Sequence, residues 1–301
     1  MEWMNPYYYS ILMICGINII LATSLNVISG FTGQFSIGHA GFMSVGAYVS
    51  SYLSLQLLER IPALADPSQP ISLLLFLGVL IAAGLASAIV GYLVGLPSLR
   101  LKGDYLAIVT LGFGEIIRVI VLNVNEVGGA RGLAGIPPYS NIFWVYGWVF
   151  LTVFILSRLV YSAPGRAMMA VREDEIAAEA MGVPITQVKV RAFVIGAFFA
   201  GIAGGLFAHF IRYINPQTFD FNRSFEIIIM VVLGGMGSLT GSVIAAILLT
   251  VLREALRPLQ EITHIDLRMI IYSLLLIILM LTRPRGIMGQ REWTRWWRRA
   301  S

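Results

Sequence analysis

The sequence has 301 residues, of which 57% are hydrophobic and only 12% are charged. A mean hydropathy of +0.81 is too high for a soluble globular domain of this length, so the chain is predicted to be an integral membrane protein. Its net charge of +5 is distributed beside apolar segments and forms no separate basic domain, which excludes a nucleic-acid-binding module.

Apolar segments long enough to cross a bilayer recur along the chain. Each crossing needs about 20 mainly apolar residues, and lipid offers the backbone no hydrogen-bond partners, so these segments are predicted to be helices. The first contains Cys15, the single cysteine, which excludes an internal disulfide framework or a Cys-rich metal site. No signal peptide precedes it, so this span is expected to stay in the protein. The predicted spans are 8–29, 36–58, 71–96, 105–123, 142–159, 190–211 and 267–281.

Two glycine-rich breaks interrupt this pattern, at residues 30–41 and 234–241. The second divides the segment 225–256 after about ten apolar residues, which reach roughly half the bilayer as a helix, so a broken or re-entrant helix is predicted. Two roles stay open: irregular backbone can line a watery path, or small residues can let helices pack closely. The candidate path-lining residues are Gly33, Ser36, Gly38, His39, Gly41, Gly234, Gly235, Gly237 and Ser238.

Glu115 and Arg118 stand three residues apart in the span 105–123. They share one helix face, with Glu115 near the middle of the bilayer, where neither charge can face lipid without a large penalty. An intramembrane ion pair is predicted, which either lines a path or joins two helices. Asparagines are likewise predicted to form hydrogen bonds between helices, namely Asn18, Asn26 and Asn123.

A charged segment, residues 162–184, lies between the fifth and sixth spans. Pro164 near its start, and Gly182 and Pro184 at its end, predict one helix over residues 165–182. Its apolar residues recur at helical spacing and are predicted to form one docking stripe, comprising Met169, Ile176, Ala177 and Ala180. The opposite face is predicted to contact water and comprises Arg172, Glu173, Asp174, Glu175 and Glu179. Such a helix in a membrane chain indicates a soluble partner.

Basic residues are concentrated in the loops that this order of spans places on one side. By the positive-inside rule, residues 160–189 and the C-terminus are predicted to be cytoplasmic, provided that the segment 225–256 enters and leaves from the outer face. Trp and Arg mix in residues 291–299, a combination suited to anionic headgroups. Residues 1–283 are therefore expected to form a single transmembrane domain, followed by a basic Trp/Arg cytoplasmic tail, 284–301.

The fold class predicted from these features is an all-α polytopic membrane protein. It should contain about 8–10 transmembrane helices, a glycine-broken re-entrant segment and a cytoplasmic charged helix. The sequence contains no GxxxxGK[ST], HExxH, GxSxG or CxxC motif, so ATPase, metal-hydrolase, serine-hydrolase and thiol-redox chemistry lack support. The chain is therefore predicted not to be an enzyme and to bind no metal.

Four blocks occur in a fixed order along the chain: NVISGFTGQFSIGHAGF at 26–42, LRLKGDYLAIVTLGFGE at 99–115, the charged segment 165–182, and VLGGMGSLTG at 232–241. Together they resemble the LivM-type permease subunit of bacterial branched-chain amino acid ABC importers. The resemblance covers most of the chain. Importers of urea and short amides look similar, so the substrate stays an alternative within this group.

The resemblance implies that residues 1–283 are a permease domain of the bacterial inner membrane and that the charged helix couples it to ATPases. In such importers this helix follows an EAAxxxG pattern, to which Ala177, Ala178 and Gly182 conform, whereas Ile176 replaces the glutamate and Glu175 lies one residue early. The implied coupling residues are Arg172, Glu175, Ala177, Ala178, Glu179 and Gly182. The implied partners are a second, related permease chain, two ATPases that bind ATP and Mg²⁺, and an extracytoplasmic substrate-binding protein. No cofactor is expected on this chain.

Two rival functions come from other classes. An ion-coupled secondary transporter would use Glu115 and the broken helices as a cation site and would need no ATPase. A membrane-embedded enzyme would need a catalytic pair, which the sequence does not offer.

Overall fold

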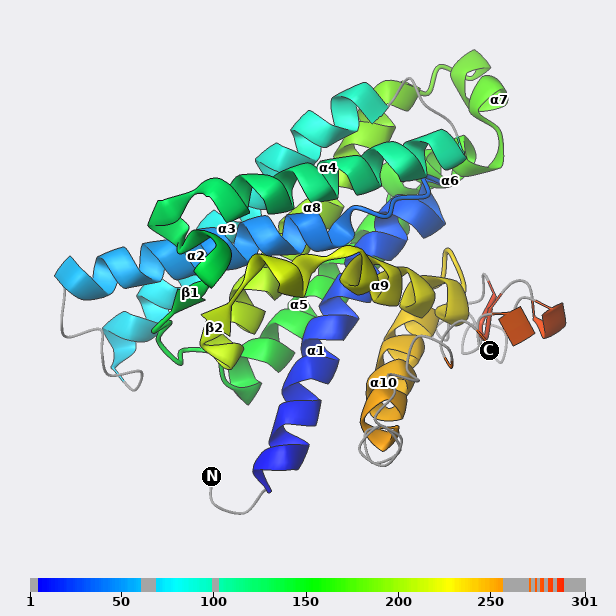
Figure 1. Ribbon diagram of the computed structural model, residues 1–301. Coiled ribbons are helices and arrows are strands. Elements are labelled where there is room, and N and C mark those ends of the chain that lie inside the picture. The colour runs from blue at the N-terminus through cyan, green and yellow to red at the C-terminus, as the bar shows by residue number, and fades with distance from the viewer. Residues whose placement is uncertain are drawn as a thin grey trace.

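The computed structural model describes residues 5–60, 69–98 and 103–256, and beyond them positions 271, 274, 277, 278, 281–283 and 286–289. The predicted span 267–281 and the predicted tail 284–301 therefore lie mostly outside the described residues. Within the described ranges the chain is almost entirely helical, which confirms the all-α class (Figure 1). The α-helices are α1 (Pro6–Asn26), α2 (His39–Arg60), α3 (Pro70–Ser98), α4 (Asp104–Asn123), α5 (Ile142–Val160), α6 (Ala163–Glu173), α7 (Glu175–Ala180), α8 (Ile185–Ile211), α9 (Phe221–Gly234) and α10 (Leu239–Ala255).

Five helical segments in the described part are long and apolar enough to cross a membrane: Pro6–Phe31, Ile71–Pro97, Tyr105–Asn123, Ile142–Val160 and Ile185–Ile211. Each contains one of the predicted spans. The last begins earlier than the predicted start at Val190, because Lys189 lies inside α8 with its charge paired to Glu175. The chain is thus polytopic, and the predicted total of transmembrane helices stays a prediction.

Helix α8 lies at the centre and packs against α1, α2 and α3. Glycines make this approach close: a Cβ atom on Gly204 would collide with the Met43 carbonyl of α2, and one on Gly201 would collide with Ser87 of α3. Lipid gives helices no hydrophobic reason to associate, so such backbone proximity and the dispersion contacts that follow hold them together. Small residues on α8 therefore allow the close helix packing at the centre of the molecule.

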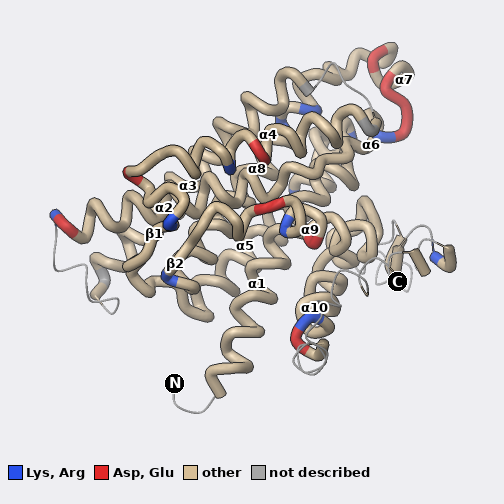
Figure 2. Tube along the Cα trace, in the orientation of Figure 1, with Lys and Arg blue, Asp and Glu red and all other residues tan. Residues whose placement is uncertain are grey.

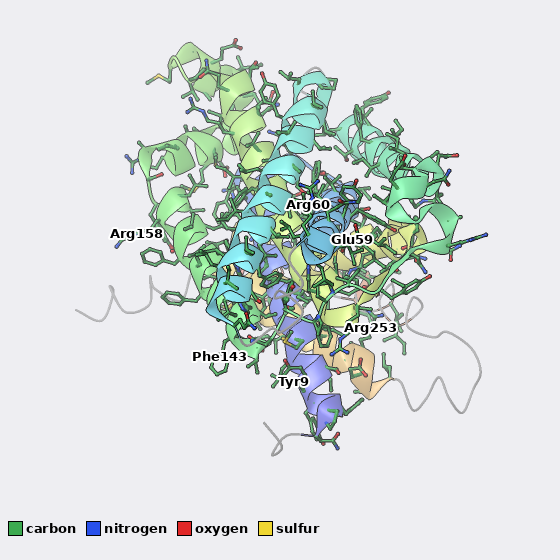
Figure 3. The ribbon with its side chains drawn as sticks, turned by 90° about the vertical axis from the view of Figure 1, so that its left-hand side faces the viewer. Tyr9, Glu59, Arg60, Phe143, Arg158 and Arg253 are labelled. Atoms are coloured by element: carbon green, nitrogen blue, oxygen red, sulfur yellow. The ribbon has the colours of Figure 1, made fainter. Side chains whose placement is uncertain are left out.

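The outward faces of α4 and α5 are apolar. Phe143, Phe150 and Phe154 of α5 are exposed, as are Ile108 and Ile120 of α4. Figure 3 shows Phe143 and Arg158 projecting from the side of the bundle, and Glu59 and Arg60 at the end of α2 nearest the viewer. Exposed apolar faces with charges at helix ends are the arrangement expected for helices in contact with lipid.

Short strands join two distant loops. Strand β1 (Leu133–Ala134), after α4, pairs antiparallel with β2 (Tyr213–Ile214), after α8, with Leu133 opposite Ile214. Single helical turns flank them, namely Asn125–Val127, Gly129–Arg131 and Pro216–Phe219. This pairing fixes the end of the molecule opposite α6 and α7 (Figure 1).

The segment after β2 is a broken helix, as predicted. Helix α9 ends at Gly234, and α10 begins at Leu239 after a turn in which Gly235 and Gly237 have positive φ. Helices α9 and α10 pack against each other, and the Arg253 side chain near the end of α10 reaches Glu226 of α9. The two helices thus form a hairpin around the glycine-rich turn.

The hairpin is longer than predicted. The first arm has 14 residues, a length of about 21 Å rather than half a bilayer. It begins at Phe221 because the Asp220 side chain caps it by accepting a hydrogen bond from the Arg223 amide at 3.0 Å. The sequence prediction started this arm at Phe225, four residues after its actual start.

The single charged helix predicted over 165–182 is wrong. Asp174, with φ −157° and ψ 113°, breaks it into α6 and α7. Its carboxylate accepts hydrogen bonds from the amides of Ile176 at 2.8 Å and Ala177 at 3.1 Å, so Asp174 is the N-cap of a second helix. The end of the charged segment at Gly182 was predicted correctly, since Gly182 has the left-handed φ of +82° that is common after a helix.

Candidate functional site: the charged tip and the two glycine-rich breaks

Helix α7 and the turn after it form the tip of the molecule, where several charged residues lie close together (Figure 2). Because of the break at Asp174, the predicted stripe does not face inward. Ile176 is 77% exposed and Met181 is 84% exposed, whereas Ala178 is buried. Ala177, Glu179 and Gly182 are exposed, and Met169 is only half-buried. The tip therefore presents two large apolar side chains outward.

Glu175 holds α7 against α8. Its carboxylate accepts a hydrogen bond from Lys189 Nζ at 2.5 Å, and the Lys189 side chain is buried. A contact with one buried partner is worth more than a surface pair, since removing either partner leaves the other charge poorly solvated. Glu175 thus fixes the tip inside this chain and is not part of the outward surface.

Arg172 was also predicted to contact water, and this prediction is wrong. Its side chain is 18% exposed and reaches inward, where Nη1 donates to the Gly30 carbonyl at 2.9 Å. Glu173 accepts from Nη2 of the same guanidinium at 2.6 Å. Arg172 therefore connects α6 to the first glycine-rich break.

The structure brings the two breaks together. The first consists of a π-helical turn, Val27–Phe31, and irregular backbone up to α2. Asn26 bridges it to the second: Oδ1 accepts from the Gly237 amide at 2.9 Å, and Nδ2 donates to the Ser238 carbonyl at 2.8 Å. This confirms the interhelical role predicted for Asn26.

Most candidate path-lining residues are buried in the chain, with Gly33 exposed. His39 Nε2 lies 2.9 Å from Ser24 Oγ. Several buried polar atoms of this region have no hydrogen-bond partner within the described part of the chain: Ser29 Oγ, Gln34 Nε2, Ser36 Oγ, His39 Nδ1 and Ser44 Oγ. Unpaired buried polar groups are expensive and need an explanation, and their concentration in and after the first break marks it as the polar element of an apolar body.

The C-terminal segment closes the second break. Ile287 donates its amide hydrogen to the Leu233 carbonyl at 2.9 Å, and Met288 donates to the Gly234 carbonyl at 3.1 Å. These are carbonyls at the C-terminus of α9 that the helix cannot satisfy itself. Residues 286–288, which belong to the predicted tail, thus pack on the break, while 290–301 lie outside the described residues.

Glu115 and Arg118 contact each other at 2.7 Å, both half-exposed on α4. The ion pair is internal to one helix: in the described ranges it joins α4 to no second helix. The path-lining role and the structural role predicted for this pair both stay predictions.

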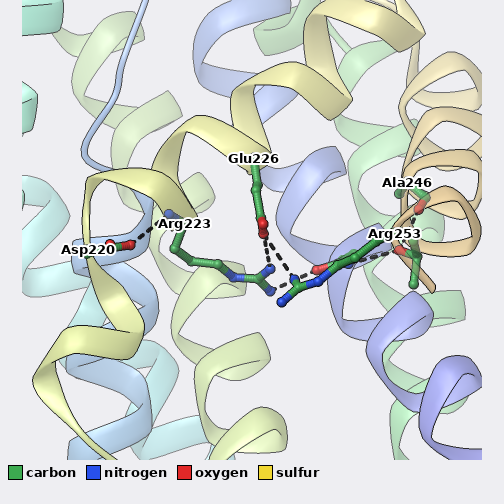
Figure 4. A network of polar contacts seen from close by, with 7 residues as sticks. Asp220, Arg223, Glu226, Ala246 and Arg253 are labelled. Atoms are coloured by element: carbon green, nitrogen blue, oxygen red, sulfur yellow. Dashed lines mark hydrogen bonds and ion pairs between the residues drawn. The ribbon is translucent and has the colours of Figure 1, made fainter. Parts of the chain in front are cut away.

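Sequence reasoning missed one network, shown in Figure 4. Glu226 accepts hydrogen bonds from Arg223 at 2.9 Å and from Arg253 at 3.3 Å, and Arg223 also donates to Asn18 Oδ1 at 2.8 Å. Asn18 in turn donates to Thr250 at 2.9 Å, so the network joins α1, α9 and α10. The i, i+3 spacing of Arg223 and Glu226 was the available signal, but Arg223 had been placed before the predicted segment 225–256.

Comparison with known proteins decides the family. The family model described as "Branched-chain amino acid transport system / permease component" matches residues 7–280. The chain belongs to this family. It is 38% identical, over 90% of its own length and 68% of the relative's, to the high-affinity branched-chain amino acid transport system permease protein LivM of Salmonella typhimurium. No solved structure matches.

For two further relatives, the match with this chain covers a larger share of the relative's length. The probable branched-chain amino acid transport permease protein LivM of Methanocaldococcus jannaschii is 27% identical over 93% of each chain. The permease protein LivH of Escherichia coli is 27% identical over 91% of each chain. As a permease component, the chain is a multi-pass membrane protein and a transport component, which confirms the prediction that it is not an enzyme.

The blocks that carried the family resemblance are neighbours in space. Thr110 of α4 accepts a hydrogen bond from the Ile37 amide of the first break at 3.0 Å, and a Cβ atom on Gly41 would lie 3.0 Å from the Gly114 Cα. The first break therefore contacts α4, the second break and α6. The permease component thus gathers all four blocks around one buried polar region.

Proposed function

We propose that the chain is the transmembrane permease subunit of an ABC importer for branched-chain amino acids, located in the bacterial cytoplasmic membrane. The substrate proposal rests on the names of relatives up to 38% identical, which are branched-chain amino acid permease proteins. The observation that carries the coupling role is the tip, which presents Ile176 and Met181 to the outside while Glu175 and Arg172 attach it to the interior.

The proposed partners follow from the same tip and family. Two cytoplasmic ATPases, which bind ATP and Mg²⁺, dock on α7 and the turn after it, and an extracytoplasmic protein delivers the amino acid. The second permease subunit is a related but different chain, as the separate LivM and LivH relatives from Escherichia coli suggest. Residues 160–189 and the C-terminus are cytoplasmic, and the chain itself binds no cofactor.

In the proposed mechanism, closure of the ATPases moves the tip and switches access to a path beside the two breaks. An apolar amino acid carries one ammonium and one carboxylate group, so exposed backbone dipoles and hydroxyl groups suit its passage without trapping it. The polar atoms of Ser29, Gln34 and Ser36 supply such groups in the first break. Alternating access of this kind needs a firm connection from tip to path more than a tight binding site.

Co-purification tests the coupling role. The chain, tagged and purified from its native membrane, should bring the ATPase subunits with it, and Ile176→Asp should reduce their yield by about tenfold, because a charge replaces an exposed apolar contact. Asn125→Asp, an exposed position beyond the far end of α4, is the matched control and should have no effect. ATPase-free uptake driven by a sodium or proton gradient would overturn the proposal in favour of a secondary transporter.

Uptake competition tests the substrate. Cells with all the partner subunits should import labelled leucine, and unlabelled isoleucine and valine should compete with it. Urea, short amides and polar amino acids should not. Competition by urea or amides alone would assign the chain to the other importers of this group.

A further inference from the structure

Arg172 occupies the last turn of α6, yet its side chain leaves the tip and enters the body of the protein. Its Nη1 donates to the Gly30 carbonyl at 2.9 Å, which belongs to the π-helical turn at the end of the first span. A hydrogen bond from a charged donor is roughly twice as strong as one between neutral groups. The contact therefore ties α6 firmly to the first break.

The Arg172 side chain also packs directly on a glycine of each break. A Cβ atom on Gly33 would lie 3.0 Å from Arg172 Cγ, and one on Gly237 would lie 2.5 Å from its Nη1. Both glycines have positive φ, +70° and +90°, so the backbone conformation favours glycine at both positions.

Asn26 completes the connection. It lies at the end of α1 next to the π-helical turn, and both ends of its amide bind the second break, at Gly237 and Ser238. A displacement of Arg172 would therefore move the first break through the Gly30 carbonyl. It would move the second through packing on Gly237 and through Asn26.

We propose that Arg172 is the positioning residue that transmits movement of the ATPase-docking tip to both glycine-rich breaks at once. The inference rests on the proposed function and deepens it, since it names the contact through which the tip acts on the path. Arg172 is therefore assigned a role inside this chain and not on the docking surface. Glu173, which shares the guanidinium and is exposed, orients Arg172 from the solvent side.

The test uses the complete transporter with its second permease subunit, ATPases and binding protein, in proteoliposomes supplied with ATP and labelled leucine. Arg172→Met keeps an unbranched apolar side chain, shorter than that of arginine, and removes every donor. We expect the ATPases to remain bound and ATP hydrolysis to stay within about twofold of wild type, while leucine uptake per ATP falls by about tenfold or more. Arg172→Lys, which restores one charged donor, should recover part of the uptake.

Arg166→Met is the matched control. Arg166 is an exposed arginine on the same helix, and within the part of the chain that the structure describes its side chain makes one long hydrogen bond, 3.4 Å, to the Tyr161 carbonyl. Its uptake per ATP should equal that of wild type. If Arg172→Met does not assemble, the comparison of Arg172→Lys with Arg172→Gln, which keeps a neutral donor on a shorter side chain, takes its place, with more uptake per ATP expected from the lysine.

Three outcomes would overturn the inference. Uptake per ATP at the wild-type level in Arg172→Met would show that the contact transmits nothing. Loss of the ATPases from that variant would move Arg172 to the docking surface. Equal uptake per ATP by Arg172→Lys and Arg172→Gln would show that the charged contact plays no part in the mechanism. Failure of the proposed function itself is distinguishable, because the wild-type chain would then bring no ATPase.

Discussion

Two arginines at opposite ends of the α9–α10 hairpin, one buried and one partly buried, are satisfied in different ways. At the start of α9, Arg223 is 9% exposed and binds a carboxylate and an amide oxygen from side chains of α9 and α1. Beside the turn of the hairpin, Arg172 binds a backbone carbonyl and packs on glycines. The first arrangement fixes three helices to one another by side chains, whereas the second holds irregular backbone that can change its torsion angles.

The comparison assigns different tasks to the two ends. Glu226 faces two guanidinium groups, and Asn18 links them to Thr250, so small displacements there break several contacts together. At the turn, positive-φ glycines and a π-helical segment allow movement at lower energy. We infer that the end near Arg223 acts as the fixed support and the end near Arg172 as the moving element.

Removal of Glu226 should have the largest effect. Glu226→Leu leaves Arg223 without its carboxylate partner in a buried site, so we expect a loss of about 3–5 kcal/mol in the free energy of unfolding. The measurement is thermal unfolding of the purified chain in detergent, with the yield of monodisperse protein. A variant as stable as wild type would show that this end is not the support.

Alanine at Gly30 should have an intermediate effect. The added Cβ atom would collide with Asn26 Oδ1 and the Gly237 amide, so the two breaks must separate, at a cost of about 1–3 kcal/mol. Leucine uptake should fall further than stability does, because the displaced backbone is the moving element. Gly112→Ala is the control, since a Cβ atom there meets nothing within 4 Å, and it should be neutral. Equal behaviour of the two variants would remove the close approach from the account.

Changes at Glu115 and Arg118 should have the smallest effect. This half-exposed pair lies within α4, so the double variant Glu115→Gln/Arg118→Gln should change the free energy of unfolding by about 1 kcal/mol or less and leave uptake unchanged. Glu115→Gln alone should be more harmful than the double change, because it leaves Arg118 unpaired. Loss of uptake in a well-folded double variant would instead place the pair on the path.

Sequence reasoning succeeded where one local pattern decides the structure. Apolar run length predicted five spans correctly, while the predicted spans 36–58 and 267–281 stay predictions; glycine punctuation predicted both breaks and the positive φ of Gly182. Interhelical bonding of Asn18 and Asn26 followed from the penalty for burying an amide, but Asn123 bonds to Val119 of its own helix, so that prediction was wrong. Exposed helix ends allow such local alternatives.

The errors share one cause, which is competition between local and long-range partners. Asp174 was predicted to lie within one helix and to contact water. A short acidic side chain can instead cap the N-terminus of a second helix, as Asp174 does for α7. Arg172 was assigned to solvent by its charge, yet the Gly30 carbonyl that receives it lies far away in sequence. The spacing of apolar and charged residues in the sequence does not indicate such a long-range contact. The same reason hid the pairing of Arg223 with Asn18.

The sidedness of the tip tests the central claim most directly, because energy from cytoplasmic ATPases can enter only through a cytoplasmic tip. Cys15 is buried, so Met181→Cys introduces an accessible thiol at a position that is 84% exposed. A membrane-impermeant maleimide should label it in inverted membrane vesicles and not in intact spheroplasts, and bound ATPases should protect it. Labelling in spheroplasts would place the tip outside the cell and contradict the account.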